Sequence, residues 1–186
     1  MTSDLSGKRI AFLVANVGVE QVELTSPWQA VKDAGGEPVL LAPDAGKVQA
    51  VKGDLNQGEV FEAEQAVSDA RSDEFAALLL PGGVANPDKL RTVPEAVEFV
   101  ASFVSANKPI AAICHGPWTL VEADVVRGKT LTSWPSLQTD IRNAGGTWQD
   151  AEVITSDDNG WTLVTSRKPD DLDAFNRAAI RAFASA

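Results

Sequence analysis

The chain's single cysteine, Cys114, follows the apolar run Ile110–Ile113 and precedes His115, Gly116 and Pro117. The run predicts a short buried strand, and a proline suits the first turn of a helix after it. A nucleophile with glycine two residues later, between strand and helix, is the arrangement of a nucleophile elbow. We therefore expect a sharp bend at Cys114, where N–H groups at the helix start lower the thiol pKa below roughly 8.5 and favour the reactive thiolate.

Cys114 also has a purely structural interpretation, because cysteine often packs in cores as a small hydrophobic residue. The following residue is the only histidine of the chain, so only His115 can supply an imidazole from the same polypeptide. Side chains of consecutive residues tend to diverge. A neutral His115 can act as general base only if the bend brings its ring and the sulfur together.

The composition predicts one domain over residues 1–186, in a chain that is 44% hydrophobic with a formal net charge of −10. One cysteine excludes an intrachain disulfide and fits a reducing compartment. The first nine residues lack the apolar core of a signal peptide, which favours a cytoplasmic location. No basic cluster indicates nucleic acid or an anionic membrane as partner. One histidine beside one cysteine makes a poor zinc site, and we expect no metal and no cofactor.

Strand-like and helix-like segments alternate along the chain. This alternation predicts an α/β fold: a doubly wound, mostly parallel sheet flanked by helices, as in flavodoxin-like three-layer sandwiches. The stretch Asp44–Asp73 is polar and suggests a small hairpin, with a short helix near Glu64–Asp69. The expected strands are Lys8–Asn16, Pro38–Ala42, Phe75–Leu80, Ile110–Ile113, Lys129–Thr132, Trp148–Thr155 and Gly160–Ser166, and the expected helices are Pro27–Gly35, Pro94–Asn107, Pro135–Asn143 and Leu172–Ala184.

Ligands in such sheets bind at the carboxyl ends of the strands, near a switch point of the topology. The ends of three predicted strands carry Glu20, the pair Gly82–Gly83, and Cys114. We expect these residues to face one crevice. The Pro81–Gly83 turn offers backbone N–H groups to an oxyanion, or is simply a tight turn. Glu20 is either part of the site or a solvated loop acid.

Five sequence blocks together resemble the PfpI-type intracellular protease family. This family belongs to the class I glutamine amidotransferase-like superfamily and is related to the parkinsonism-associated protein deglycase. The similarity runs from about Arg9 to about Phe183, with the blocks in the family's order. The blocks are Val19–Leu24, Leu80–Gly83, Ala112–Trp118, Thr132–Trp134 and Thr165–Leu172.

The resemblance implies a role for each matching residue. Cys114 corresponds to the nucleophile, and Glu20 to the carboxyl group that hydrogen-bonds its sulfur. His115 corresponds to the histidine after the nucleophile. Asp88 falls where relatives place an acid that reaches the histidine of a neighbouring subunit, although a helix cap explains it equally. The N–H groups of Gly83 and His115 correspond to the oxyanion hole.

Electrostatics constrains the glutamate. An ionised Glu20 beside the sulfur would raise the thiol pKa, so Glu20 must be buried, protonated and donating to assist a thiolate. We expect Glu23 to have a structural role. Gly82 and Trp134 are expected to line the substrate pocket. Some relatives carry tyrosine at the position of Trp134, and this chain has no tyrosine, so an indole N–H is the only donor there.

Together these features predict a stress-protective cysteine hydrolase that acts on small carbonyl or peptide substrates. Peptidase and deglycase or glyoxalase activities all begin with the thiolate attacking an electrophilic carbon. Ammonia transfer from glutamine is not expected, because true glutamine amidotransferases use a downstream His-x-Glu and no histidine follows His115 in this chain. The alternatives are a non-enzymatic redox sensor or chaperone, in which Cys114 is oxidised to sulfinic acid, and a catalytically silent family member. The cross-subunit role of Asp88 requires a homodimer or a higher homo-oligomer.

Overall fold

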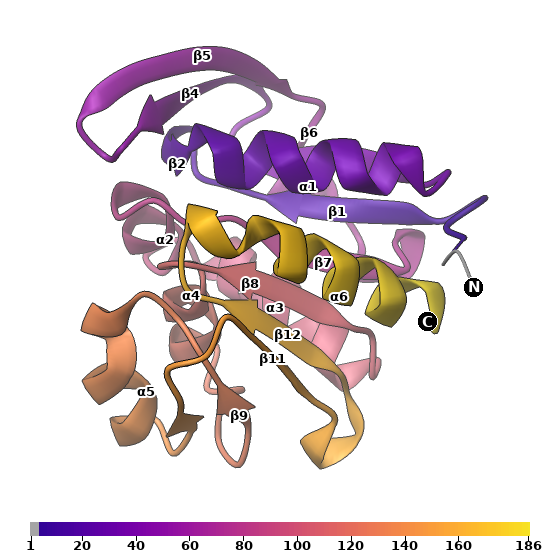
Figure 1. Ribbon diagram of the computed structural model, residues 1–186. Helices are drawn as coiled ribbons and strands as arrows, with labels where there is room; N and C mark the ends of the chain where they lie inside the picture. Colours follow the sequence, from indigo (N-terminus) through magenta and orange to yellow (C-terminus); the bar gives the residue numbers. More distant parts are fainter. Residues whose placement is uncertain (1–3) are drawn as a thin grey trace.

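The main sheet has seven strands in the order β11-β12-β8-β7-β1-β3-β6 (Figure 1). The structure is a computed structural model that describes residues 4–186, so the signal-peptide prediction lies partly outside the described residues. All neighbours pair in parallel except β11 and β12. The strands are β1 Arg9–Leu13, β3 Glu37–Ala42, β6 Gln65–Ala66, β7 Ala77–Leu80, β8 Ile110–Ile113, β11 Val153–Ser156 and β12 Leu163–Ser166.

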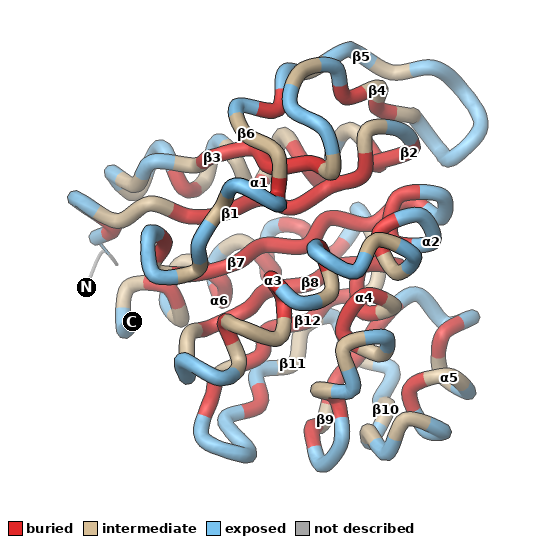
Figure 2. The backbone as a smooth tube through the Cα atoms, turned by 180° about the vertical axis from the view of Figure 1, so that it is seen from behind, coloured by how far each residue is buried: buried red, intermediate tan, exposed pale blue. Residues whose placement is uncertain are grey.

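Helices cover both faces of this sheet, which confirms the predicted doubly wound α/β fold. Successive strand residues point to opposite faces, so Ile10 and Phe12 of β1 join one core cluster and Ala11 and Leu13 join the other. Figure 2 shows the central strands as buried. Helices α1 Gln21–Asp33 and α6 Leu172–Ala184 contribute to the first cluster, and α3 Pro94–Ser105 and α4 Pro117–Glu122 contribute to the second.

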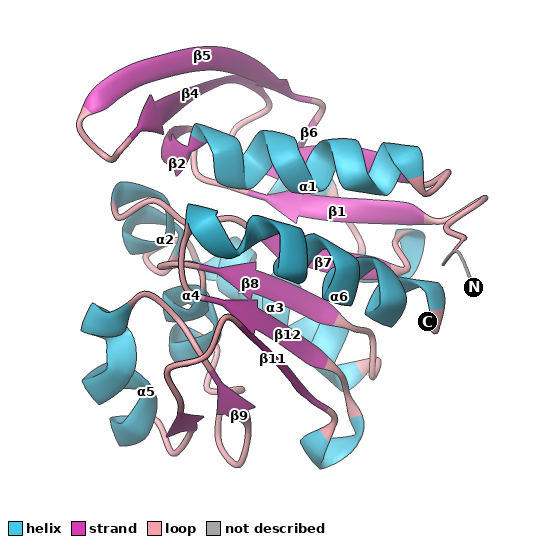
Figure 3. Ribbon diagram, viewed as in Figure 1, coloured by secondary structure: helices cyan, strands magenta, loops and turns pink. Residues whose placement is uncertain are grey.

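A second sheet of three strands lies beside the first and arches over the start of α1 (Figure 3). It contains β2 Val17–Glu20, β4 Gly46–Lys52 and β5 Asn56–Ala63. Strands β4 and β5 form the predicted hairpin. The helix expected near Glu64–Asp69 is a single 3₁₀ turn, η1 Val67–Asp69, and a second turn, η2 Ser72–Glu74, follows it.

Several elements differ from the sequence predictions. Helix α1 begins at Gln21, not at Pro27, which lies inside the helix. The buried positions Glu23, Leu24, Pro27 and Val31 form one face, and packing of this face outweighs the hydrogen bond that proline cannot make. Strand β9, Thr130–Leu131, pairs only with β10, Thr147–Trp148, and is not part of the main sheet. The strand expected over Trp148–Thr155 is two short strands, β10 and β11, which belong to different sheets.

The remaining helices are short, and most lie at the carboxyl end of the sheet. They are α2 Ala85–Leu90, α5 Gln138–Asn143 and the 3₁₀ turns η3 Pro135–Leu137 and η5 Pro169–Asp171, while the 3₁₀ turn η4 Asp158–Gly160 connects β11 to β12. Within residues 4–186, no helix combines the length and apolar character needed to cross a membrane.

Candidate active site

Cys114 lies at a bend between strand β8, which ends at Ile113, and helix α4, which begins at Pro117. Its φ of 61° is in the left-handed region, which non-glycine residues adopt rarely. Gly116 permits the bend, because a Cβ atom there would lie 2.6 Å from the carbonyl oxygen of Leu80. The local sequence therefore folds into the predicted strand–turn–helix geometry.

The bend brings the cysteine and histidine side chains into contact. Cys114 Sγ and His115 Nδ1 are 3.2 Å apart, and both residues are buried. The other ring nitrogen, Nε2, lies 3.5 Å from the hydroxyl of Ser136. The imidazole also stacks on Trp134, with ring centroids 5.8 Å apart, and lies against Trp118 on a tilted plane. These contacts fix the ring with one nitrogen toward the sulfur.

The carboxyl group that acts on the pKa of the sulfur is that of Glu23, whereas the resemblance assigned this position to Glu20. Glu23 is fully buried in the first turn of α1, and its Oε2 accepts the N–H of Gly82 at 2.9 Å. Burial, with smaller effects from the nearby charges of Glu20 and Asp54, raises the pKa of Glu23 from 4.5 to about 8. Glu23 is therefore protonated at neutral pH, the state that the sequence argument required of Glu20.

The thiol of Cys114 is less acidic than the sequence argument predicted. Burial, and then the charge that Glu23 carries when ionised, raise the thiol pKa above its ordinary value. Backbone N–H groups of Gly83 and His115 hydrogen-bond the sulfur and oppose this shift without cancelling it. The expected lowering of the pKa is therefore wrong for this structure, and the thiol needs a base.

His115 is suited to be that base. Its pKa lies below the ordinary 6.5 because the ring is buried, although the charge of Asp54 opposes the shift. A neutral imidazole has one ring nitrogen free to accept a proton. With that nitrogen as Nδ1, His115 can take the proton of the Cys114 thiol directly.

The Pro81–Gly83 turn is held close behind the sulfur. Gly83 has a φ of 80°, and a Cβ atom there would lie 2.4 Å from the carbonyl oxygen of Gly18. Buried Asn86 stabilises the turn through three hydrogen bonds. Its side-chain NH₂ group donates to the carbonyl oxygens of Pro81 and Gly82, and its Oδ1 accepts the N–H of Ala15. These contacts hold the backbone amide of Gly83 in a fixed position beside the sulfur.

A cavity of about 400 Å³ opens above the sulfur. Glu20 and Trp134 line it, as expected, whereas Gly82 is not among its lining residues, which corrects the prediction for Gly82. Asp88 is exposed on α2 and makes no hydrogen bond to His115 within the part of the chain that the structure describes. The cavity is lined by Glu20, Val22, Glu23, Gly53, Asp54, Gly83, Cys114, Trp134 and Pro169.

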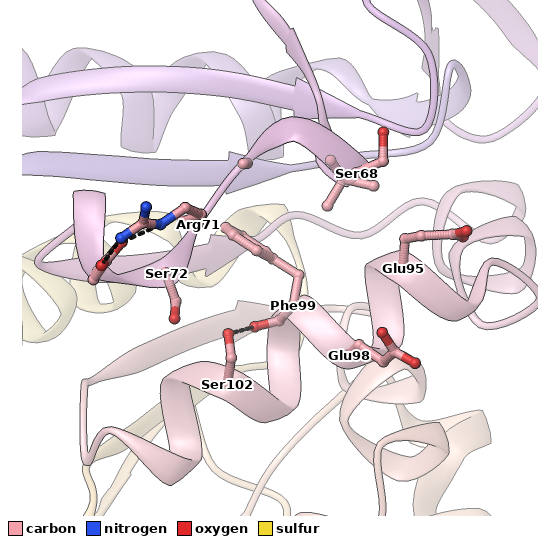
Figure 4. A pocket seen from close by; sticks show the side chains of 10 residues that line it. Ser68, Arg71, Ser72, Glu95, Glu98, Phe99 and Ser102 are labelled. Carbon is pink, nitrogen blue, oxygen red and sulfur yellow. Dashed lines mark hydrogen bonds and ion pairs between the residues drawn. The ribbon is translucent and has the colours of Figure 1, made fainter.

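Another hollow, of about 470 Å³, lies between the two 3₁₀ turns and α3, and its lining contains neither Cys114 nor His115. Figure 4 shows Phe99 between Arg71 and the carboxylates Glu95 and Glu98 in this hollow. Arg71 pairs with Asp73, so its charge is already neutralised. No cluster of three potential metal ligands occurs within residues 4–186. The cavity at Cys114 is therefore the candidate active site, because a nucleophile lines it.

Three residues of the site were missed in the sequence, and Glu23 was expected to have only a structural role. Glu23 faces inward because α1 starts at Gln21, which places Glu23 in the first turn, on the buried face of the helix. Asp54, Asn86 and Ser136 come from loops and short helices whose positions no local pattern reveals. Each meets its partner through the tertiary fold.

Fold and site together define a doubly wound α/β protein with a buried cysteine–histidine pair at the carboxyl edge of its sheet. Residues 8–182 match the model of the DJ-1/PfpI family. The chain belongs to this family, as the resemblance in its sequence predicted.

Individual relatives agree with this assignment. YraA of Bacillus subtilis, provisionally named a cysteine protease, is 42% identical over 93% of this chain and 96% of its own. Protein/nucleic acid deglycase 2 of Escherichia coli is 43% identical over 94% of this chain and 96% of its own. The structure of Drosophila melanogaster DJ-1beta superposes with a TM-score of 0.82 at 24% identity, over 96% of this chain and 91% of the other, which shows the shared fold.

Proposed function

We propose that this protein is a stress-protective cysteine hydrolase of the PfpI type that acts on carbonyl substrates. The observation that carries the proposal is the 3.2 Å contact between Cys114 Sγ and His115 Nδ1 at the base of an open cavity. The names of relatives, which include a deglycase and a provisional protease, support the same chemistry. General base and nucleophile are in contact, as nucleophilic catalysis requires.

The reaction begins with the thiol, not with a preformed thiolate. As the sulfur of Cys114 attacks the carbonyl carbon, its proton passes to His115 Nδ1, and the Nε2–H faces the Ser136 hydroxyl. N–H groups of Gly83 and His115 stabilise the developing oxyanion. Protonated Glu23 adds no negative charge beside the reacting sulfur. Water then hydrolyses the adduct and releases Cys114.

The size of the cavity limits the substrate. About 400 Å³ accommodates a small carbonyl compound, a carbonyl adduct of one side chain, or one residue of a peptide. Deglycase, glyoxalase and peptidase activities share the first step. The protein is proposed to work in the cytoplasm as a homodimer or a higher homo-oligomer.

A substrate panel tests the function. The purified protein is incubated with methylglyoxal, with glycated thiols and amines, and with peptides, and product formation is followed by mass spectrometry. We expect turnover of at least one class, and a loss of about a thousandfold or more in Cys114→Ala, whose fold is checked by circular dichroism. A folded wild-type protein that turns over none of these classes would contradict the proposal.

The redox-sensor alternative receives less support from the site. Peroxide oxidises thiolates, and the raised thiol pKa of Cys114 keeps the sulfur protonated. Selective formation of sulfinic acid at Cys114 after mild peroxide, together with no turnover in the panel, would reverse this preference.

A further inference from the structure

Negative charge dominates the cavity above Cys114. Three of its nine lining residues are acids, namely Glu20, Glu23 and Asp54, and none is lysine or arginine. Glu23 is protonated at neutral pH, so Glu20 and Asp54 carry the charge. A cavity with charges of one sign favours ligands of the opposite sign.

Backbone donors hold the two carboxylates at the cavity. The N–H of Asp54 donates to Glu20 Oε2 at 3.2 Å, and the N–H of Val84 donates to Asp54 Oδ1 at 2.8 Å. These bonds join three segments: the end of β2, the β4–β5 turn and the start of α2. Each carboxylate thus has one oxygen engaged and one available to a ligand.

Both carboxylates lack a partner of opposite charge within the described residues. Within residues 4–186, neither Glu20 nor Asp54 forms an ion pair with lysine or arginine. The lysine next to the lining residue Pro169 is Lys168, and it pairs with Asp170 at 2.9 Å. The negative potential therefore acts on whatever enters the cavity.

Glu23 adds a hydrogen-bond donor to the same cavity. Glu23 lines the same cavity and is fully buried, yet its Oε1 has no hydrogen-bond partner among the described residues. Leaving a buried polar atom unpaired is costly. Because Oε2 accepts the N–H of Gly82, the proton of neutral Glu23 lies on Oε1, and the carbonyl oxygen of a substrate would accept it.

We infer that Glu20 and Asp54 make the Cys114 cavity select carbonyl substrates that carry a positively charged group near the reacting carbon, and reject those that carry a carboxylate. The inference deepens the proposed function and rests on Cys114 as the reacting atom. Adducts carried on guanidinium or ammonium groups fit this description, whereas a small carbonyl acid such as glyoxylate does not. We expect a preference of about tenfold or more for the cationic member of a charge-matched pair.

The single cysteine allows this selection to be measured without any turnover. Methanethiosulfonates of similar size with an ammonium, a neutral or a sulfonate head react with Cys114: its sulfur bonds to the thioalkyl sulfur, a sulfinate leaves, and the thiol proton passes to the buffer. Intact mass reports the rate of this step. Each rate is divided by that of a free thiol, because the reagents differ in intrinsic reactivity.

For the wild-type protein at low salt, the corrected rates should fall from the ammonium through the neutral to the sulfonate reagent. Added salt should reduce the difference. Glu20→Gln and Asp54→Asn should each lower the ammonium-to-sulfonate ratio several-fold, and the double variant should bring it near that of the free thiol. Glu62→Gln, at an exposed position on β5, removes the same charge from a distant surface and should leave the ratio unchanged.

A wild-type ratio equal to that of the free thiol would overturn the inference without any variant. An equal reduction by Glu62→Gln would also overturn it, because the net charge of −10 would then explain the preference. Failure of the proposed function can be distinguished from failure of this inference. If labelling is charge-selective but no substrate in the panel is turned over, the hydrolase proposal is contradicted and the charge selectivity of the cavity still holds.

Discussion

Glu23 decides the electrostatics of the site at the scale of single residues. It is fully buried against the sulfur of Cys114, and its neighbours Glu20 and Asp54 disfavour its ionisation. The thiol and the carboxyl therefore titrate as a pair. Below the pKa of Glu23 the pair is neutral, and ionisation of Glu23 above it makes the thiol harder to deprotonate.

The raised pKa of Glu23 predicts how stability changes with pH. The pKa rises from 4.5 to about 8 on folding, so between these values the folded protein keeps a proton that the unfolded chain loses. The free energy of unfolding should therefore fall as the pH rises through this window, by on the order of 3 kcal/mol for this one group. Urea unfolding of Glu23→Gln at pH 5 and pH 8 should show this part of the pH dependence removed.

Glu62→Gln, which changes an exposed acid, provides the matched control and should keep the wild-type pH dependence. A Glu23→Gln variant with the full wild-type loss of stability between the two pH values would show that Glu23 ionises normally. The assignment of Glu23 as the protonated acid would then be wrong.

At the scale of elements, Asn86 of α2 connects two loops that shape the site. It accepts the N–H of Ala15 at 2.6 Å and donates to the carbonyl oxygens of Pro81 and Gly82 at 3.0 and 3.1 Å. The loops after β1 and β7 are thereby joined at the switch point of the sheet. This connection holds the Gly83 amide against the sulfur.

Replacing Asn86 by alanine should therefore destabilise both the fold and the site. Three buried hydrogen bonds are lost, and we expect a decrease of about 2–4 kcal/mol in the free energy of unfolding, measured by urea denaturation. Asn143→Ala, an exposed change at the end of α5, should stay within about 0.5 kcal/mol of the wild type. Equal effects of the two substitutions would contradict the role of Asn86.

At the scale of the whole molecule, Asp88 makes no hydrogen bond or ion pair with His115 within residues 4–186, so its predicted role requires a second subunit. Exposed apolar side chains near the cavity support such an interface: Val22, Val84 and Trp134 are 39%, 40% and 39% exposed. Asp88 lies on α2, which begins directly after Val84. A second copy seated on this surface would bring its own Asp88 toward the cavity.

We expect a dimeric or larger mass in sedimentation, and a specific activity that falls on dilution below the dissociation constant. Asp88→Asn should reduce kcat about tenfold or more and shift its pH profile, because an acid at a neighbouring histidine sets the pKa and tautomer of that histidine. Glu62→Gln should change neither. A monomeric protein with full activity would refute the shared site.

Much of the architecture was predictable because it depends on the types and spacing of residues that are close in the sequence. The apolar runs identified the central strands, and Cys114, Gly116 and Pro117 identified the bend. The start of α1 was missed because Pro27 resembles a helix start, whereas inward packing of the preceding turn decides the boundary. That error hid Glu23, since only a helical first turn points its side chain at the sulfur.

The sequence by itself determined the family, the layered α/β fold and the position of the nucleophile candidate at a strand–helix bend, because each depends on short-range patterns. Only the tertiary structure decided that Glu23 contacts Cys114, that the thiol pKa rises, and that Asp54 joins the cavity. These features depend on burial and on contacts between segments about 30 to 90 residues apart. Local sequence patterns reveal neither burial nor contacts between distant segments, because desolvation is a property of the packed molecule.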